Sequence, residues 1–384
     1  MLNINEKVEL LMRGTDYGDP AIGKAMAEEL KARLQAAEAS GKPLRVYCGY
    51  DPTSSDLHLG HTISMRKLKQ FQDLGHEVFF VIGSFTSLIG DPSGKDKSRP
   101  LVSKEEIIEN GKTYAEQAFR VLDRNKTQVV YNSDWLEKVT LEEIFRMATN
   151  FTAQQILARD NFARRLEVGE PIHLHEFFYP LSQGYDAHHL EADVQVGGQD
   201  QLYNIVTASR KVMEGYGQKP NIGILMPLLP GTDGVQKMSK SLGNTIPIHT
   251  TAEDMYGKVM SNAELAEFET GLETGGLHPR DAKMRLAFEI TRLFYGDQAA
   301  KTAETQFVAM FQKGDMPDEM PEYQLQGDEA LLDVMVANGL AGSKTQARRL
   351  IDQQGVKWDG VTVADPQLVL DSEGVLQAGK RHYL

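Results

Sequence analysis

One stretch near the N-terminus constrains the fold more than any other part of the chain. Residues 44–48 form a short apolar run that is typical of a buried strand, and residues 49–55 are rich in the turn formers Gly, Asp, Pro and Ser. A helical pattern then runs from Leu57 to a stop at Gly75, and a second apolar run follows at 78–82. Strand, turn, helix and strand form a βαβ unit, which predicts an α/β fold on a parallel sheet.

The start of this helix carries two histidines, His58 and His61, on one face of its first turn. Gly60 lies between them and removes a side chain where a flat ring could lie against the backbone. We expect Ser55 or Asp56 to cap the helix. The unpaired N–H groups of a helix start attract anions, so the turn suits a nucleotide with its phosphates alongside. Alone, so short a motif is weak, because histidines at a helix start are often only capping groups.

A second motif, Lys-Met-Ser-Lys-Ser at 237–241, follows a loop rich in Pro and Gly at 227–234. Lys237 and Lys240 on such a loop can close on a polyphosphate and neutralise the charge that develops as pyrophosphate leaves. The alternative is a solvated basic loop. Five specified residues rarely match by chance, and the His-Leu-Gly-His turn lies upstream.

Together the two motifs match the signatures of class I aminoacyl-tRNA synthetases, and the chain most closely resembles bacterial tyrosyl-tRNA synthetases over nearly its whole length. The resemblance implies an enzyme that activates L-tyrosine with ATP, releases pyrophosphate and transfers tyrosine to tRNA(Tyr). Catalysis would rest on positioning and charge stabilisation without a protein nucleophile. Mg²⁺ would arrive with ATP, and we expect no tightly bound cofactor and no dedicated metal ligands.

The resemblance also implies a domain organisation. We expect a Rossmann-like catalytic domain at 1–245, a helical anticodon-binding domain at 246–313, a linker at 314–327 and a small α+β RNA-binding domain at 328–384. The catalytic domain would include a helical insertion at about 110–168. An apolar stripe in that insertion is ordinarily a core face, but in this family the insertion forms the subunit interface, so we expect a homodimer. The stripe consists of Ile144, Phe145, Met147, Phe151, Ile156 and Leu157.

Three polar residues of the segment 179–186 would share one helix face, because Tyr179, Gln183 and Asp186 are spaced i, i+4 and i+7. A buried phenol, amide and carboxylate need a polar ligand or each other, and the alternative is an amphipathic helix with polar surface groups. The resemblance assigns Tyr179 and Gln183, with Asp91, to the α-ammonium group of tyrosine. It assigns Asp186 to the substrate hydroxyl. Tyr47 would bind that hydroxyl from across the pocket, and Gln201 would lie on the tyrosine carboxyl side.

The expected strand 192–196 ends before two glycines and an acid, an arrangement that suits a ribose at the carboxyl edge of a sheet. The resemblance implies an ATP site made of Gly49, Asp51, His58, Gly60, His61, Gly198, Asp200, Lys237 and Lys240. It implies phosphate-directed catalytic groups at Thr53, His58, His61, Lys95, Arg99, Lys237 and Lys240. The loop 89–99 is not a P-loop, because its glycine spacing is one residue short; a surface loop with solvated charges is the alternative to phosphate contact there.

Further elements follow from local patterns. We expect helices at 21–39, 103–122, 140–168, 252–260, 263–268, 281–294 and 298–312, and a strand at 127–131. In the tail, helices at 330–338 and 343–351 precede a hairpin at 355–363 with Asp-Gly at its turn. This tail resembles a module of RNA-modifying enzymes, which assigns phosphate contacts to Lys344, Arg348, Arg349 and Lys357.

Composition limits the cellular compartment and the partners that we expect. The single cysteine excludes an internal disulfide and fits a reducing compartment, and no signal peptide or membrane-spanning run is visible, so we expect a cytoplasmic protein without a membrane partner. The net charge of -13 argues weakly against RNA binding. Two alternatives stay open. One is another His-x-Gly-His adenylyltransferase, with a tryptophanyl enzyme as nearest neighbour. The other is a non-enzymatic RNA-binding paralogue, which would carry damaged motifs.

Overall fold

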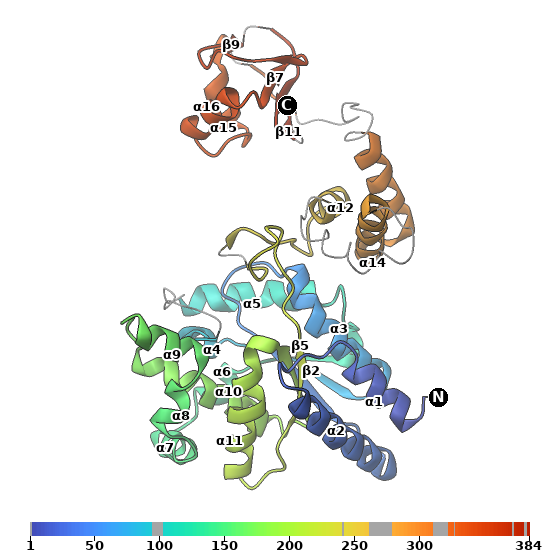
Figure 1. Cartoon of the computed structure of the whole chain (residues 1–384), viewed down its shortest axis with the longest axis vertical. Helices are drawn as coiled ribbons and strands as arrows, with labels where there is room; N and C mark the ends of the chain where they lie inside the picture. The colour runs from blue at the N-terminus through green and yellow to red at the C-terminus, as the bar shows by residue number, and fades with distance from the viewer. Residues whose placement is uncertain are drawn as a thin grey trace. The chain divides into compact units, whose positions relative to one another are not determined.

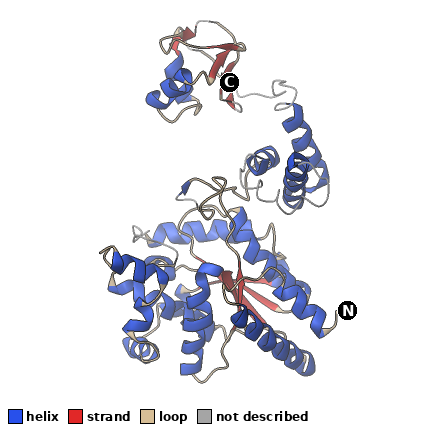
Figure 2. Ribbon diagram, in the orientation of Figure 1, coloured by secondary structure: helices blue, strands red, loops and turns tan. Residues whose placement is uncertain are grey.

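A parallel sheet forms the centre of the fold in a computed structural model that describes residues 2–93, 103–239, 242–260, 279–309, 322–325, 327–370, 372–379 and 382–384 (Figure 1, Figure 2). The chain divides into two units, Met1–Glu304 and Thr305–Leu384. The sheet lies in the first unit and has the strand order β3-β2-β1-β4-β5. Its strands are β1 (Arg45–Tyr50), β2 (Glu77–Ile82), β3 (Thr127–Tyr131), β4 (Val194–Gly198) and β5 (Ile222–Met226).

All neighbouring strands of this sheet are parallel, as the βαβ pattern predicts. The chain winds outward from β1 to β3 and then returns to place β4 on the other side of β1. This order creates a switch point between β1 and β4, where a crevice forms at the carboxyl ends of the strands. The predicted Rossmann-like α/β class is confirmed.

Helices cover both faces of the sheet because alternate side chains of each strand point to opposite sides. Val46 and Cys48 of β1 join the larger core, whereas Tyr47 joins the smaller one on the other face. The larger core includes residues of α1 (Ile4–Met12), α2 (Pro20–Ser40), α3 (Leu59–Asp73) and α5 (Lys104–Ala118). The smaller one includes α6 (Ser133–Leu136), α10 (Phe178–His189) and α11 (Arg210–Gly215).

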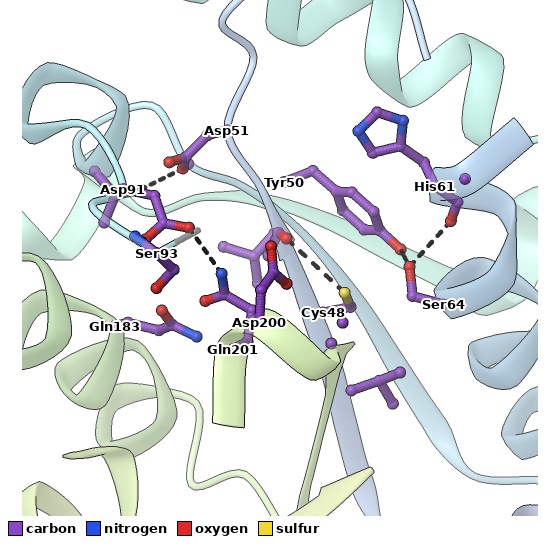
Figure 3. Close-up of a pocket in the computed structure, with 18 of the residues that line it drawn as sticks. Cys48, Tyr50, Asp51, His61, Ser64, Asp91, Ser93, Gln183, Asp200 and Gln201 are labelled. Carbon is purple, nitrogen blue, oxygen red and sulfur yellow. Dashed lines mark hydrogen bonds between the residues drawn. The ribbon is translucent and has the colours of Figure 1, made fainter. Parts of the chain in front are cut away.

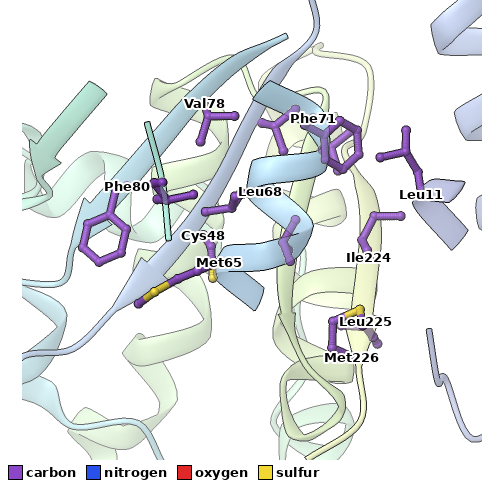
Figure 4. Close-up of a cluster of buried hydrophobic side chains, with 14 of the residues drawn as sticks. Leu11, Cys48, Met65, Leu68, Phe71, Val78, Phe80, Ile224, Leu225 and Met226 are labelled. Carbon is purple, nitrogen blue, oxygen red and sulfur yellow. The ribbon is translucent and has the colours of Figure 1, made fainter. Parts of the chain in front are cut away.

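Helix α3 is held firmly on the sheet, which matters because its first turn carries the two histidines. Met65, Leu68 and Phe71 are fully buried at helical spacing and pack among side chains of β1, β2 and β5 (Figure 4). Deeply buried apolar side chains of this size each contribute about 1.5–3 kcal/mol. The orientation of the histidine turn therefore follows from the core.

The expected cap of this helix is wrong. The helix begins at Leu59 with His58 as its N-cap, and neither Ser55 nor Asp56 caps it. The reason is tertiary: the Leu59 N–H donates to the Ile246 carbonyl at 2.9 Å, and the Ile248 N–H donates to the Leu57 carbonyl at 3.1 Å. Backbone from far along the chain thus takes the place of a side-chain cap.

The other predicted element boundaries differ less from those in the structure. The expected strand 127–131 is β3 exactly as bounded, whereas the strand expected at 192–196 lies at Val194–Gly198 and includes both glycines. Residues 110–131 of the expected insertion belong to α5 and β3, and so to the sheet and its covering layer. The separate helical lobe contains α7 (Leu141–Ala148), α8 (Ala153–Leu157) and α9 (Asp160–Glu167).

Short elements complete the sheet domain. They are α4 (Thr86–Ile89), η1 (Arg124–Lys126), η2 (Leu174–Phe177), η3 (Gln199–Gln201) and η4 (Tyr203–Ser209). The last of these is a π-helix that leads directly from the Gly-Gly turn into α11. Wide turns of this kind occur often near functional sites.

Where residues 252–308 are described, the chain is helical, as expected. It contains α12 (Ala252–Met260) and α14 (Pro279–Val308), the latter interrupted at Gly296, whose φ of 83° accounts for the two helices expected there. The helix expected at 263–268 lies outside the described residues, as does most of the expected linker 314–327. Among the described residues, no helix combines the length and apolar character that crossing a bilayer requires.

The second unit contains the small α+β fold that the sequence predicts. Helices α15 (Leu331–Ala337) and α16 (Lys344–Asp352) share a core with the strands that follow. The strands are β6 (Glu329–Ala330), β7 (Val356–Trp358), β8 (Val361–Thr362), β9 (Val369–Leu370), β10 (Leu376–Ala378) and β11 (His382–Tyr383). The expected hairpin joins β7 and β8, and its Asp359 and Gly360 both have positive φ, as a tight primed turn requires.

Candidate active site

A cavity of about 760 Å³ opens at the carboxyl ends of β1 and β4. It has the size of a typical small-molecule site. The sequence-predicted residues that line it are Tyr47, Gly49, Asp51, Thr53, His58, Gly60, His61, Asp91, Tyr179, Gln183, Asp186, Gly198, Asp200, Gln201 and Lys237. The structure therefore brings together every predicted cavity residue that it describes. Lys95, Arg99 and Lys240 lie outside the described residues.

The cavity has two chemically different ends. The buried end is formed by Tyr47, Asp51, Asp91, Tyr179, Gln183, Asp186 and Gln201, and the loop end by Thr53, His58, His61, Asp200 and Lys237. Figure 3 shows Asp51, Asp91, Gln183 and Gln201 gathered on one side of the strands and His61 of α3 on the other.

Asp186 is the most buried acid of the cavity, with 4% of its surface exposed. The indole N–H of Trp135 donates to its Oδ1 at 2.7 Å, and the Asn132 amide donates to its Oδ2 at 3.2 Å. Burial raises the pKa of Asp186 to about 7, although these two donors act in the opposite direction. The carboxyl is thus fixed in position and close to its protonation midpoint at neutral pH.

Tyr47 of β1 lies near Asp186 and is 1% exposed. Its hydroxyl donates to the Gln183 backbone carbonyl at 3.3 Å. Burial raises the pKa of Tyr47, and the neighbouring Asp186 charge raises it further, so the phenol stays neutral. A carboxyl and a phenol together at the buried end of the cavity are suited to bind a hydroxyl group.

Tyr179 and Asp51 connect α10 to the strand β1. The Tyr179 hydroxyl donates to Asp51 Oδ2 at 2.9 Å, and the Thr86 hydroxyl donates to Asp51 Oδ1 at 2.7 Å. A Cβ atom on Gly83 would lie 1.9 Å from Asp51 Oδ1, so only glycine permits this arrangement. Asp51, which the resemblance assigns to ATP, therefore lies beside Tyr179 at the buried end.

Asp91 and Gln201 form the adjoining wall. The Gln201 amide donates to Asp91 Oδ2 at 2.7 Å, and the Ser93 N–H donates to Asp91 Oδ1 at 2.8 Å. The side-chain oxygen of Gln183, in contrast, is buried and has no hydrogen-bond partner among the described residues. Carboxylates with an unsatisfied amide oxygen nearby provide acceptors for a cationic group such as an ammonium.

The two histidines at the loop end contact each other, with ring centroids 3.8 Å apart. The His58 N–H donates to His61 Nδ1 at 3.1 Å, which leaves His61 Nε2 on the far side of the ring. A Cβ atom on Gly60 would lie 3.0 Å from His58 Nδ1, so this glycine makes room for the His58 ring itself. Gly49, in contrast, has nothing within 4 Å of where a Cβ would stand, so the backbone of β1 is bare there.

Lys237 bridges the cavity from the loop side. Its Nζ lies 2.9 Å from Asp200 Oδ2, just after β4. The lysine is 36% exposed and the acid 20% exposed. The lysine loop, described at residues 230–239 and 242–244, is thus joined to η3, a contact between two predicted motifs that spacing alone does not reveal.

The chain matches known sequence families along most of its length. The family described as tRNA synthetases class I (W and Y) matches residues 39–312, and the tyrosine--tRNA ligase SYY-like C-terminal domain matches residues 312–384. The tyrosine--tRNA ligase of Moorella thermoacetica is 49% identical, with 93% of this chain and 91% of the relative covered. That of Thermotoga maritima is 42% identical, with coverages of 98% and 96%.

The chain belongs to the tyrosine--tRNA ligases. Solved structures support the fold. The tyrosyl-tRNA synthetase of Archaeoglobus fulgidus, complexed with L-tyrosine, superposes with a TM-score of 0.59 at 21% identity over 79% of this chain and 100% of that one. A truncated mitochondrial enzyme of Aspergillus nidulans gives 0.59 at 22% identity, with 81% and 95% covered. The class I synthetase fold expected from the two motifs is therefore confirmed.

The sequence reasoning missed three residues that hold the acids of the buried end in place: Thr86, Asn132 and Trp135. Asn132 is 1% exposed and donates to both Asp186 and Thr86. It follows β3 directly, at the carboxyl edge where ligands of parallel sheets bind, and this position was the available signal. Trp135 carries no comparable signal, because an aromatic residue on a short helix usually means core.

The four tail residues assigned to RNA are all exposed. Lys344 forms an ion pair with Asp333 of α15, whereas Arg348, Arg349 and Lys357 form no salt bridge with the part of the chain that the structure describes. Among the described residues, no group of three or more His, Cys, Asp or Glu side chains is arranged to hold a metal ion.

Proposed function

We propose that the cavity makes tyrosyl-adenylate from L-tyrosine and ATP and that the enzyme then transfers the tyrosyl group to tRNA(Tyr). The single observation that carries this assignment is the pair of Tyr47 and Asp186 at the buried end, which suits a phenolic hydroxyl. A tryptophan side chain would offer no hydroxyl to these groups. A paralogue without activity would not need the intact loop end.

In this proposal the buried end binds tyrosine along its length. Asp186 and Tyr47 bind the hydroxyl, and phenylalanine would leave them unpaired; discrimination of this kind is the standard example of hydroxyl recognition without editing. Tyr179, Gln183 and Asp91 bind the α-ammonium group, and Gln201 lies beside the carboxylate. The partnerless Gln183 oxygen supports this role.

The loop end would bind ATP. The bare backbone of Gly49 and the histidine turn accommodate the nucleotide, with Gly60 making room for the His58 ring, and Gly198 and Asp200 hold the ribose. Thr53, His58 and His61 approach the phosphates. One tyrosine carboxylate oxygen attacks the α-phosphorus, the bond from that phosphorus to the bridging oxygen breaks, and pyrophosphate leaves with both electrons of that bond.

Lys237 would neutralise the leaving pyrophosphate, together with Lys240, Lys95 and Arg99. Preorganised cations at a developing anion commonly contribute a factor of about 10²–10³ in rate. Asp51 would act from beside Tyr179 rather than at the nucleotide. Mg²⁺ would enter bound to the ATP phosphates, which it prefers together with water.

The tRNA would contact the helical domain and the tail, where Lys344, Arg348, Arg349 and Lys357 meet phosphates. We also propose a cytoplasmic homodimer that pairs through the helical lobe. Large apolar side chains are exposed there or on the adjoining segment, as a subunit interface would require: Leu141, Phe145, Leu166, Val168 and Leu174. Met147 and Ile156 of the predicted stripe are core residues.

Exchange of labelled pyrophosphate into ATP tests the assignment, with each of the twenty amino acids offered separately. We expect exchange with tyrosine alone. Exchange with another amino acid would overturn the roles of Tyr47 and Asp186 while keeping the reaction class. No exchange from folded protein would favour the RNA-binding paralogue. Sedimentation of wild type and Phe145→Asp tests the dimer, which the variant should weaken.

A further inference from the structure

A buried asparagine, Asn244, connects the two sides of the lysine loop. It is 3% exposed. Its Oδ1 accepts a hydrogen bond from the Ser239 N–H at 2.7 Å, and its Nδ2 donates to Asp233 Oδ2 at 2.6 Å and to the Lys237 carbonyl at 3.2 Å. Its own carbonyl accepts from the Thr232 N–H at 2.9 Å. One side chain thus ties together both sides of the loop.

The loop is shaped around this amide. A Cβ atom on Gly231 would lie 2.1 Å from Asn244 Nδ2, so that position must be glycine for the amide to fit. The Gly231 N–H donates to the Gln236 carbonyl at 2.7 Å, closing the turn between them. Asp233 supports the turn as well, because its Oδ1 accepts from the N–H groups of Val235 and Gln236 at 3.0 and 3.1 Å.

Lys237 lies at the point where these bonds converge. The Lys237 carbonyl accepts a hydrogen bond from Asn244, and the Lys237 ammonium group reaches Asp200. The N–H of the next residue, Met238, donates to the Leu229 carbonyl at 2.8 Å. An amide that binds the backbone of a lysine determines where its ammonium group can reach. Misplacement of a reacting charge by about 1 Å can cost on the order of 100-fold in rate.

We propose that Asn244 is a positioning residue for adenylate formation, which sets the backbone of Lys237 so that its ammonium group meets the leaving pyrophosphate. The inference rests on the proposed function, because it assumes that Lys237 acts on the phosphates. Asn244 itself does not touch the substrate in this account. The alternative is that Asn244 only stabilises the fold.

The test is single-turnover formation of tyrosyl-adenylate by Asn244→Ala, with tyrosine and MgATP saturating. We expect a rate lower by about 10- to 100-fold. Tyrosine affinity, measured by equilibrium titration, should stay within twofold of wild type because the buried end is unchanged. Val235→Ala is the matched control, because this side chain is 88% exposed in the same loop. Its rate should equal that of wild type.

Three further variants separate positioning from stability. Gly231→Ala should reproduce the loss, since the added methyl occupies the place of the Asn244 amide. Asn244→Asp should also be slow, because its carboxylate faces the Asp233 carboxylate and cannot donate to the Lys237 carbonyl. Asp233→Asn in the same chain removes the charge repulsion and should restore stability but not the rate, because the Lys237 carbonyl still lacks its donor. A stability defect without a positioning role would lower the melting temperature and the fraction of active sites but leave the rate per active site unchanged.

A rate per active site within twofold of wild type in both Asn244→Ala and Gly231→Ala would overturn the inference. So would an equal loss of tyrosine affinity and rate. If Asn244→Ala does not fold, Gly231→Ala and the double variant decide the matter. Failure of the proposed function is distinguishable, since wild type itself would then make no adenylate.

Discussion

The two ends of the cavity are built in different ways. The buried end takes Tyr47 from β1 and Tyr179, Gln183 and Asp186 from α10, while Asp51, Asp91 and Gln201 come from short segments beside them. Several of its polar groups already hold hydrogen bonds within the protein. The loop end combines the histidines at the start of α3 with groups from irregular or short segments, Thr53, Asp200 and Lys237, and its Lys237 side chain remains about one-third exposed. The difference indicates that recognition of a small substrate depends on a rigid frame, whereas charge neutralisation is left to a segment that reaches in from outside.

The electrostatic surroundings differ in the same sense. At the buried end, loss of hydration raises the pKa of Asp186 to about 7, so a charge there is costly and its hydrogen bonds are correspondingly strong. At the loop end, water still screens the Lys237–Asp200 pair, and such exposed pairs contribute only about 0–1 kcal/mol. Substitutions at the two ends should therefore differ in size and in the kinetic parameter affected.

The largest effect is expected for Asp186→Ala. The variant should lose on the order of a thousandfold in kcat/KM for tyrosine, because the substrate hydroxyl loses a partner and Trp135 and Asn132 are left unsatisfied. Its affinity for ATP should change little. Pyrophosphate exchange at varied tyrosine and varied ATP measures both. Asp134→Ala, an exposed acid on α6, is the control. Equal losses for tyrosine and ATP would contradict the assignment.

Lys237→Ala should give a smaller loss of another kind. The rate of adenylate formation should fall about a hundredfold, because a cation that stabilises the leaving group is removed. Tyrosine affinity should stay within twofold. Rapid-quench kinetics and equilibrium titration give the two quantities. The exposed Lys219→Ala should behave as wild type. A loss of tyrosine affinity in Lys237→Ala would show that the ends are not separable.

The raised pKa of Asp186 predicts a pH-dependent stability. Folding raises this pKa from an ordinary 3.8 to about 7, so between these values the folded protein holds a proton that the unfolded chain has released. Wild type therefore loses free energy of unfolding as pH rises from about 4 to 7, by at most about 1.4 kcal/mol per pH unit. Asp186→Asn should not lose stability in this way, because an asparagine side chain does not titrate.

Denaturant unfolding of the two proteins without ligand, at a series of pH values, measures this effect. The difference in free energy of unfolding, variant minus wild type, should increase from about pH 4 to pH 7 and then level off. A difference that does not vary with pH would mean that Asp186 keeps an ordinary pKa, whatever the absolute stability of the variant.

The smallest expected difference between the two ends is in how strongly salt affects substrate binding. Raising ionic strength from about 0.05 to 0.5 M shortens the screening length to less than half, so KM for ATP should rise severalfold. Tyrosine affinity should change by less than twofold, because the buried end excludes the screening ions. Steady-state exchange in potassium chloride gives the first value and equilibrium titration the second. Equal sensitivity would contradict the contrast between the ends.

The sequence predicted residues that line the cavity, but of the two donors that hold Asp186 it offered a signal only for Asn132 and none for Trp135. Spacing placed Tyr179, Gln183 and Asp186 on one helix face because a helix is a local structure with a fixed period. The donors that hold Asp186 come from residues about fifty positions earlier, next to β3, and only the order of the strands brings them near. The role of Asn244 could not be predicted either, because an asparagine before an apolar run belongs to no local pattern and its contacts form only in the folded loop.

By itself, the sequence determined the elements and the chemistry: the βαβ unit at 44–82, the strand 127–131, the tight Asp359-Gly360 turn, and the two motifs that identify a class I synthetase. These depend on local periodicity, on backbone angles and on residue type, all of which act over a few positions. Only the tertiary structure decided that His58 caps α3, that Asp51 turns toward Tyr179 and that Lys237 meets Asp200. Such contacts join residues far apart in the chain, and their geometry follows from how the core packs.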